Sequence, residues 1–293
     1  MPPPGRPVRV EEATNQTHCV FLFMSLEELG WSVFFAEQLN HYQKQDLRPA
    51  RVVSVQRSGL SLNDGTGEIT SKLGSKWFQE SVKTHPVIGD WVLVAKKGQV
   101  TELLKRKNVL ERIAPNTNGK VQSIVANLDL LFIVSSCNDE FNESRLERFL
   151  TLASSADIES VILLTKPDLT EDGDSYRRRA QKLTNEHVEL INATSFNGSR
   201  DLFKYLKVGK TLALIGSSGV GKSTILNTLS QQQIQKTRPI RETDSKGMHT
   251  TTSRSLHIIQ DRGIIIDSPG VREIALVDDH INLKSSFEDI ENL

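Results

Sequence analysis

Hydrophobic positions between Arg48 and Arg112 fall into short runs that polar and turn-forming residues separate. The runs read ARVVSV, GLSLND, GEITSKL, PVIGDWVLV and QVTELL, with glycine, aspartate or proline between or within them. This spacing predicts five short strands that form a small antiparallel barrel. A sandwich fragment or an irregular sheet would give the same pattern, so both alternatives stay open.

A different pattern of hydrophobic residues begins after a polar connector at residues 113–120. The continuous apolar runs Leu130–Ser135 and Val161–Thr165 bracket an amphipathic stretch at Ser144–Ser154. Strands that alternate with amphipathic helices are typical of a parallel sheet covered by helices, so an α/β fold is predicted here. Further helices are expected near residues 176–185 and 201–206, and further strands at residues 188–191, 211–215, 255–259 and 263–266.

The first residues follow neither pattern. Residues 1–23 are rich in proline and then polar, whereas Ser25–Leu39 carries apolar residues at helical spacing. Two interpretations are open: translation starts at Met1 and produces a flexible arm, or it starts at Met24.

Composition narrows the class of protein. Lysine plus arginine and aspartate plus glutamate number 36 each, so no overall charge indicates a nucleic acid or a membrane as partner. The two cysteines, Cys19 and Cys137, predict neither a disulfide framework nor a zinc site. No apolar run approaches the roughly 18 residues that span a bilayer. The composition favours a soluble protein of the reducing cytoplasm.

The strongest chemical signal is a phosphate-binding loop. Residues 216–224 read GSSGVGKST and match G-x-x-x-x-G-K-[ST] between a predicted strand and a predicted helix. The glycines let backbone N–H groups surround phosphates, while Lys222 would reach the outer phosphates and Ser223 would ligate Mg²⁺. The candidate nucleotide-binding residues are Gly216, Ser217, Ser218, Gly219, Val220, Gly221, Lys222, Ser223 and Thr224.

Two other segments carry signals for guanine. TKPD at residues 165–168 ends a predicted strand and resembles the GTPase motif N/T-K-x-D, although Lys-Pro-Asp is also ordinary turn chemistry. The carboxylate of Asp168 can accept hydrogen bonds from two guanine edge donors that adenine lacks, and the Lys166 stem would pack along the base. ATS at residues 193–195 resembles the second, weaker base-contacting loop. The candidate base-binding residues are Thr165, Lys166, Pro167, Asp168, Ala193, Thr194 and Ser195.

Magnesium and the γ-phosphate have candidates nearer the C-terminus. DSPG at residues 267–270 follows an apolar strand and matches D-x-x-G, in which Asp267 holds Mg²⁺ through water and the N–H of Gly270 meets the γ-phosphate. A plain Asp-Pro-Gly turn is the alternative. GMHTTT at residues 247–252 lies where GTPases keep a threonine that completes the magnesium shell. Spacing does not single out one threonine, and we take Thr250 and Thr251 as candidate ligands.

The order of these motifs is unusual. The guanine motif at residues 165–168 comes first, the phosphate-binding loop second and DSPG last. Ordinary GTPases place the guanine motif after the other two. The order therefore predicts a circularly permuted GTPase.

In combination, the motifs resemble those of the ribosome-small-subunit-dependent GTPases, the RsgA (YjeQ/YloQ) family. The likeness runs from about Met24 to the last residue and includes PVIGDWV, QSIVANLDLLFIV, TKPDL, GSSGVGKSTILN, GMHTTTS and DSPGVRE. It implies an N-terminal OB-fold barrel, a permuted GTPase domain and a C-terminal zinc-binding domain. It also implies GTP and Mg²⁺ as ligands, the small ribosomal subunit and its rRNA as partners, and GTP hydrolysis that this particle stimulates during its late maturation. We expect a monomer.

The resemblance sets the expected domain boundaries. We predict an N-terminal extension and helix at residues 1–45, the barrel at 46–112, the GTPase domain at 113–280, and the start of a truncated C-terminal region at 281–293. The zinc module of the family should begin beyond residue 293, and neither cysteine is placed to replace it. Zinc is therefore expected only in a longer product.

Catalysis is expected to depend on positioning and charge neutralisation. Lys222, Ser223, Mg²⁺ and the loop amides would do most of this work. Val271 follows DSPG and cannot hydrogen-bond a water, so the glutamine of Ras-like enzymes is missing. His249 is our candidate for orienting the attacking water, with a surface histidine in a mobile loop as the alternative.

Three rival functions stay open. The first is a GTP-gated rRNA- or ribosome-binding module with little coupled hydrolysis, because the zinc domain is missing. An ATP-dependent kinase or ATPase on the same loop is disfavoured by Asp168. A large-subunit permuted GTPase shares the motif order, but the barrel before the guanine motif argues against it.

Overall fold

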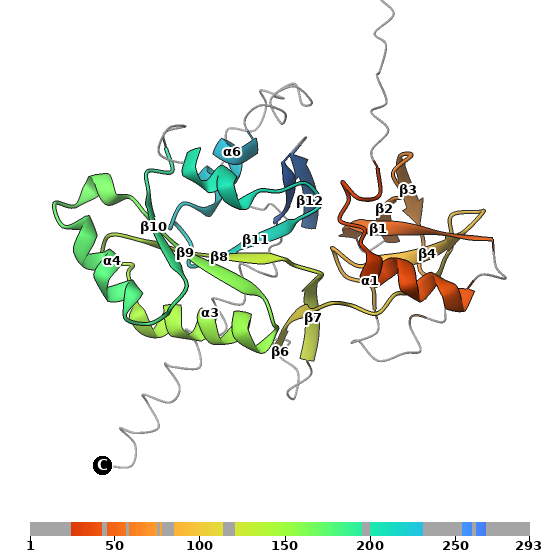
Figure 1. The fold of residues 1–293 in the computed structure, drawn as a ribbon, viewed down its shortest axis with the longest axis horizontal. Coiled ribbons are helices and arrows are strands. Elements are labelled where there is room, and N and C mark those ends of the chain that lie inside the picture. The colour runs from red at the N-terminus through yellow and green to blue at the C-terminus, as the bar shows by residue number, and fades with distance from the viewer. Residues whose placement is uncertain are drawn as a thin grey trace, which may run out of the picture.

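The computed structural model describes residues 25–42, 46–56, 59–74, 77, 85–113, 121–194, 200–230, 254–259 and 262–267. Most described strands belong to one sheet with the path β10-β9-β8-β11-β13-β12-β1-β2-β3, from which β4 and β5 branch at β1. Figure 1 shows the N-terminal strands on one side of the molecule and the α/β part on the other.

The N-terminal strands form an antiparallel group around a core of their own. β1 is its centre, because it pairs with both β2 and β4, and β3 and β5 lie outside them. Val52, Leu62 and Val92 pack there with Trp77, so apolar residues of the predicted strands face inward. The strands are β1 (Leu47–Gln56), β2 (Gly59–Asn63), β3 (Glu68–Ser71), β4 (Trp91–Ala95) and β5 (Val100–Leu103).

The expected helix at Ser25–Leu39 is broken. The chain makes a turn and then two short helices, α1 (Val33–Ala36) and the 3-10 helix η1 (Glu37–Tyr42). Gly30 is the reason, since its φ of +87° leaves the helical region, and a Cβ there would lie 2.9 Å from the carbonyl oxygen of Gly209.

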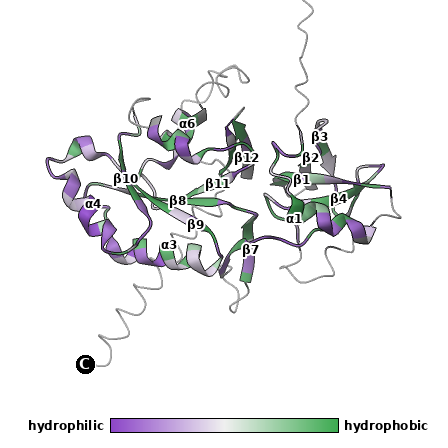
Figure 2. Cartoon of the chain, viewed as in Figure 1, coloured by the Kyte–Doolittle hydropathy of each residue, from purple (hydrophilic) through white to green (hydrophobic). Residues whose placement is uncertain are grey.

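The α/β part follows the predicted alternation of strands and helices. The helix expected near residues 201–206 is the 3-10 helix η4. Hydrophobic residues follow the central strands, whereas α4 is largely hydrophilic (Figure 2). The strands are β8 (Leu130–Ser136), β9 (Glu159–Thr165), β10 (His187–Ile191), β11 (Thr211–Ile215) and β13 (Gly263–Asp267). The helices are α3 (Glu143–Ser155), η3 (Pro167–Leu169), α4 (Gly173–Gln181), η4 (Arg200–Tyr205) and α6 (Lys222–Ser230).

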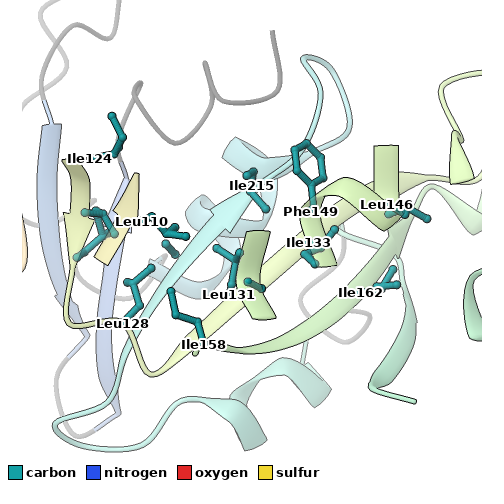
Figure 3. Close-up of a cluster of buried hydrophobic side chains, with 14 of the residues drawn as sticks. Leu110, Ile124, Leu128, Leu131, Ile133, Leu146, Phe149, Ile158, Ile162 and Ile215 are labelled. Atoms are coloured by element: carbon teal, nitrogen blue, oxygen red, sulfur yellow. The ribbon is translucent and has the colours of Figure 1, made fainter. Parts of the chain in front are cut away.

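Each face of this sheet has a buried core. On one face, Ile133 and Ile162 of the strands meet Leu146 and Phe149 of α3 (Figure 3). On the other face, Ile225 of α6 belongs to a second cluster, which also includes residues of η4. Burial on both faces explains why the central strands read as continuous apolar runs.

Two features were not predicted. β12 (Arg254–Ile259) runs antiparallel to β13 and also pairs with β1, so the sheet is mixed and joins the α/β part to the N-terminal strands. β6 (Val109–Ile113) and β7 (Val121–Ala126) form a separate two-stranded sheet, and the expected connector lies between these two strands in the sequence. Within the described part of the chain, no helix is long and apolar enough to cross a membrane.

A buried arginine joins the two parts. Arg51 of β1 is 1% exposed and donates from Nη2 to the hydroxyl of Thr211 at 2.8 Å, and from Nη1 to the carbonyl of Leu29. Burial lowers the pKa of Arg51 to about 10, although the nearby carboxylates of Asp129 and Asp90 act to raise it. The side chain is therefore charged at neutral pH. Thr211 is the first residue of β11, so Arg51 links the N-terminal strands to the strand that leads into the phosphate-binding loop.

A buried ion pair joins the segment before β4 to the segment after β5. Asp90, from the segment PVIGDWV, accepts bonds of 2.8 Å from Nε and Nη2 of Arg106 and a 2.7 Å bond from the N–H of Val87. Burial raises the pKa of Asp90, and the bonds from Arg106 act against that rise. The pair therefore holds the turn before β4 against the segment that leads to β6.

We expect Arg51→Met to lower the free energy of unfolding by about 3 kcal/mol, because it leaves several buried acceptors unsatisfied. Urea denaturation followed by circular dichroism measures the change. Lys96→Met is the control, since the Lys96 side chain is 82% exposed, and it should leave the midpoint unchanged. Equal midpoints for both variants would contradict the role of Arg51.

Candidate functional site

The candidate site lies where several strands end. β8, β9, β10, β11 and β13 run parallel, so their carboxyl ends reach the same edge of the sheet. Thr165 ends β9, Ile191 ends β10, Ile215 ends β11 and Asp267 ends β13. The four motifs that start at Thr165, Ala193, Gly216 and Asp267 therefore begin at this edge, which is where α/β sheets bind ligands.

The phosphate-binding loop forms a pocket. Three glycines adopt positive φ values, 151° at Gly216, 79° at Gly219 and 99° at Gly221. At Gly216 a Cβ would lie 2.1 Å from the carbonyl oxygen of Val134, so the loop passes too close to β8 for any side chain. A cavity of about 340 Å³ is lined by Gly216, Ser218, Gly219, Gly221, Lys222, Ser223 and Thr224.

Positive charge is concentrated at this pocket. Lys222 is only 9% exposed, and its ammonium donates to the carbonyl of Gly216 at 2.7 Å and to that of Ser217. The same residue begins α6, whose N-terminus carries the positive end of the helix dipole. Ser223 follows with an exposed side chain. The arrangement suits a phosphate group.

The guanine motif contacts the phosphate-binding loop directly. The buried hydroxyl of Thr165 lies 2.6 Å from the carbonyl oxygen of Val220 and 3.1 Å from that of Ser135. Lys166 follows in the left-handed region, at φ 57° and ψ 38°, and Pro167 begins the short helix η3. Asp168 is exposed on that helix. The structure therefore brings together two motifs that the sequence separates by about fifty residues.

The candidate for the second base-contacting loop is connected to α6. The carbonyl of buried Ala193 accepts a 3.0 Å hydrogen bond from the hydroxyl of Thr228. Asn192, which sequence reasoning missed, accepts bonds from the N–H and the hydroxyl of Thr194 at 3.1 and 2.6 Å. Ser195 lies outside the described residues.

The magnesium candidates are partly described. Asp267 ends β13 opposite Ser255 of β12 and is partly exposed. His249, Thr250, Thr251 and Gly270 lie outside the described residues. Among the residues that the structure describes, no cluster of three or more histidine, cysteine, aspartate or glutamate side chains could hold a metal. Ser223 and Asp267 provide oxygen ligands of the kind that Mg²⁺ prefers, and Mg²⁺ usually takes few protein ligands beside water and phosphate oxygens.

Comparison with known proteins identifies the family. The model of the RsgA GTPase family matches residues 103–277. "Small ribosomal subunit biogenesis GTPase RsgA 2" of Vibrio parahaemolyticus is 41% identical over 285 residues, which cover 95% of this chain and 78% of that protein. The RsgA protein of Mesorhizobium japonicum is 43% identical over 274 residues, with 92% and 78% covered.

The chain belongs to the RsgA GTPase family. The resemblance predicted from the motifs is thereby confirmed, and the family is one of enzymes that act on GTP. Two solved structures have a similar fold: YjeQ from Thermotoga maritima, with a TM-score of 0.58, and YloQ, described as a circularly permuted GTPase, with a TM-score of 0.53. Both are 25% identical to this chain; they cover 78% and 76% of it, and it covers 76% and 71% of them.

Two residues outside the motifs contact the site of this RsgA family member. Nη1 of Arg145, from α3, donates to the hydroxyl of Ser217 at 2.6 Å. Thr228 of α6 holds Ala193 as described above. No sequence signal identified either residue, because each contact joins segments far apart in the chain and neither residue belongs to a motif.

We expect Thr165→Val to weaken the binding of guanine nucleotides about tenfold, because it keeps the side-chain shape but leaves the carbonyl of Val220 without its buried donor. Titration with a fluorescent GDP analogue measures the affinity. Thr165→Ser retains the hydroxyl and should bind within about twofold of the unmodified chain. If Thr165→Val and Thr165→Ser bind the GDP analogue equally well, the Thr165 hydroxyl does not contribute to nucleotide binding.

Proposed function

We propose that this chain binds GTP with Mg²⁺ and hydrolyses the GTP during late maturation of the small ribosomal subunit, which stimulates the reaction. The observation that carries the proposal is the contact between Thr165 of the guanine motif and Val220 of the phosphate-binding loop. This contact supports the proposal, because a GTPase must recognise the base and the phosphates in one site. The names of the relatives supply the biological process.

In the proposed reaction the protein contributes position and charge. Lys222 and the amides of residues 216–224 hold the phosphates, and the N-terminus of α6 adds its dipole. Ser223 and Asp267, with Thr250 or Thr251, would hold Mg²⁺, which supplies neutralisation of the developing charge. His249 is proposed to orient the attacking water, and the N–H of Gly270 to meet the γ-phosphate.

Guanine recognition is proposed for the two loops at the ends of β9 and β10. Asp168 would accept hydrogen bonds from the guanine edge, and Lys166 and Pro167 would shape the pocket around the base. Ala193, Thr194 and Ser195 form the second contact. Support comes from the bonds that connect both loops to the phosphate-binding segment, through Thr165 and Thr228.

We also propose that residues 46–112 form an OB-fold-like barrel that contacts rRNA, with the GTPase domain at residues 113–280. The strand path β3-β2-β1-β4-β5 supports the barrel, since in an OB fold the first strand likewise pairs with the second and the fourth. The buried bonds of Arg51 support a fixed connection between the barrel and the GTPase domain.

We expect GTP hydrolysis by this chain to rise when small ribosomal subunits are added, because ordering of switch segments by a partner is a common route to GTPase activation. Phosphate release with and without subunits measures the effect. Lys222→Ala should lower the rate about a hundredfold or more, because a phosphate-binding cation is lost. Lys204→Ala, an exposed lysine paired with Glu189, is the matched control and should be neutral. Basal hydrolysis without stimulation would instead support a GTPase that is not coupled to the subunit.

Base selectivity has its own test. We expect Asp168→Asn to weaken GTP binding and to improve XTP binding, because an amide can donate to the extra carbonyl of xanthine where a carboxylate cannot. Competition of GTP, XTP and ATP against a fluorescent GDP analogue measures the ratio. If ATP competes as well as GTP with the unmodified chain, guanine recognition by Asp168 is wrong.

A further inference from the structure

Arg145 occupies an unfavourable position in its helix. α3 begins after Asn142, whose side chain accepts the N–H of Arg145 at 2.9 Å, so Arg145 lies in the first turn. A glutamate or glutamine is favoured at this third position, and the positive end of the helix dipole repels a cation there. Glu143, the acidic residue of the same turn, accepts a 2.7 Å bond from Arg179 of α4. The placement of Arg145 therefore indicates a role outside the helix.

The side chain of Arg145 contacts the phosphate-binding loop. Nη1 of Arg145 donates to the hydroxyl of Ser217 at 2.6 Å, across 72 residues of sequence. Ser217 is not among the residues that line the pocket, so Arg145 meets the loop from its outer side. The carbonyl of the same Ser217 accepts from the ammonium of Lys222 on the inner side. Ser217 thus connects Arg145 to the lysine of the motif.

Both ends of the loop are held by residues that precede it in the chain. Thr165 holds the carbonyl of Val220 near the end of the loop, and Arg145 holds the side chain of Ser217 near its beginning. Between these points the backbone contains Gly219, which has a φ of 79° and open space within 4 Å of the point where a Cβ would lie. A glycine-rich segment of this kind has little conformational preference of its own, so fixed ends determine whether its N–H groups converge on one phosphate.

We propose that Arg145 is a positioning residue of the phosphate-binding loop and that it sets the affinity for the phosphates of GTP by holding Ser217. The inference rests on the proposed function and extends it to a residue outside the GTPase motifs. Arg145 acts by holding the side chain of Ser217, and not by its charge alone. This distinction determines the experiment.

The experiment is a double-mutant cycle between the two partners of the bond. Arg145→Met removes the donor, Ser217→Ala removes the acceptor, and the double variant removes both. Arg145→Lys retains the charge and one donor. Arg178→Met is the charge-matched control, because Arg178 lies on α4, is 71% exposed and pairs with Asp172. Dissociation constants for fluorescent GTP and GDP analogues, KM and kcat for GTP, and thermal midpoints are measured for all five.

We expect Arg145→Met and Ser217→Ala each to raise the dissociation constants and the KM roughly tenfold, with kcat changed less than about twofold. The reason is that each loses an interaction that is made equally in the ground state and the transition state. The double variant should match Arg145→Met and Ser217→Ala within about twofold, since each of them already removes the bond between the two residues. Arg145→Lys should recover part of the affinity. Arg178→Met should behave as the unmodified chain.

Several outcomes would overturn the inference. Additive losses in the double variant, or a Ser217→Ala variant that binds normally, would show that Arg145 acts by charge alone. A fall in kcat without a change in KM would also contradict it. If Arg145→Met does not fold, Ser217→Ala decides the question. An unmodified chain that binds no guanine nucleotide would refute the proposed function itself, whereas normal binding by the variants would refute only the role of Arg145.

Discussion

The hydrogen bond from the Thr165 hydroxyl to the carbonyl of Val220 depends on the spacing of three parallel strands. β8 lies between β9 and β11, so the ends of the outer two strands are roughly 10 Å apart. The loop after β11 closes this distance by turning back over the end of β8, which Gly216 permits because no side chain fits against Val134. The contact joins strand ends and not neighbours in sequence. It therefore survives circular permutation, which changes only the order in which the strands are connected.

The strand before the phosphate-binding loop is held at both ends. Thr211 begins β11 and accepts a bond from Arg51, while its N–H donates to Asp129 at 2.9 Å. At the other end the loop is held by Thr165 and Arg145. All five residues of β11 are buried between the two cores. The N-terminal strands are therefore connected to the same strand that positions the loop, and a buried arginine that loses its acceptors would destabilise both parts.

Sequence patterns predicted the parts of this molecule that depend on local chemistry. The glycines of residues 216–221 permit the positive φ values that the loop adopts, and the apolar run at Val161–Thr165 is typical of a strand buried in an α/β sheet. Patterns missed what depends on distant partners. Gly30 breaks the expected first helix because Gly209 lies against it, and the pairing of β12 with β1 is set by packing. Arg145 and Thr228 belong to no motif, so only the fold reveals what they contact. The candidate site was thus predictable as motifs, but the bonds that assemble it were not.

β12 connects the two parts of the molecule through unequal pairings. It begins two residues after the segment 247–252 and pairs over five positions with β13, which ends at Asp267. Its pairing with β1 extends over only two positions, Ser54 with Ser255 and Val55 with Arg254. The backbone hydrogen bonds between two paired strands resist a displacement together. A shift of the paired β12 and β13 would therefore break the two-position pairing with β1 before it disturbs the five-position pairing between β12 and β13.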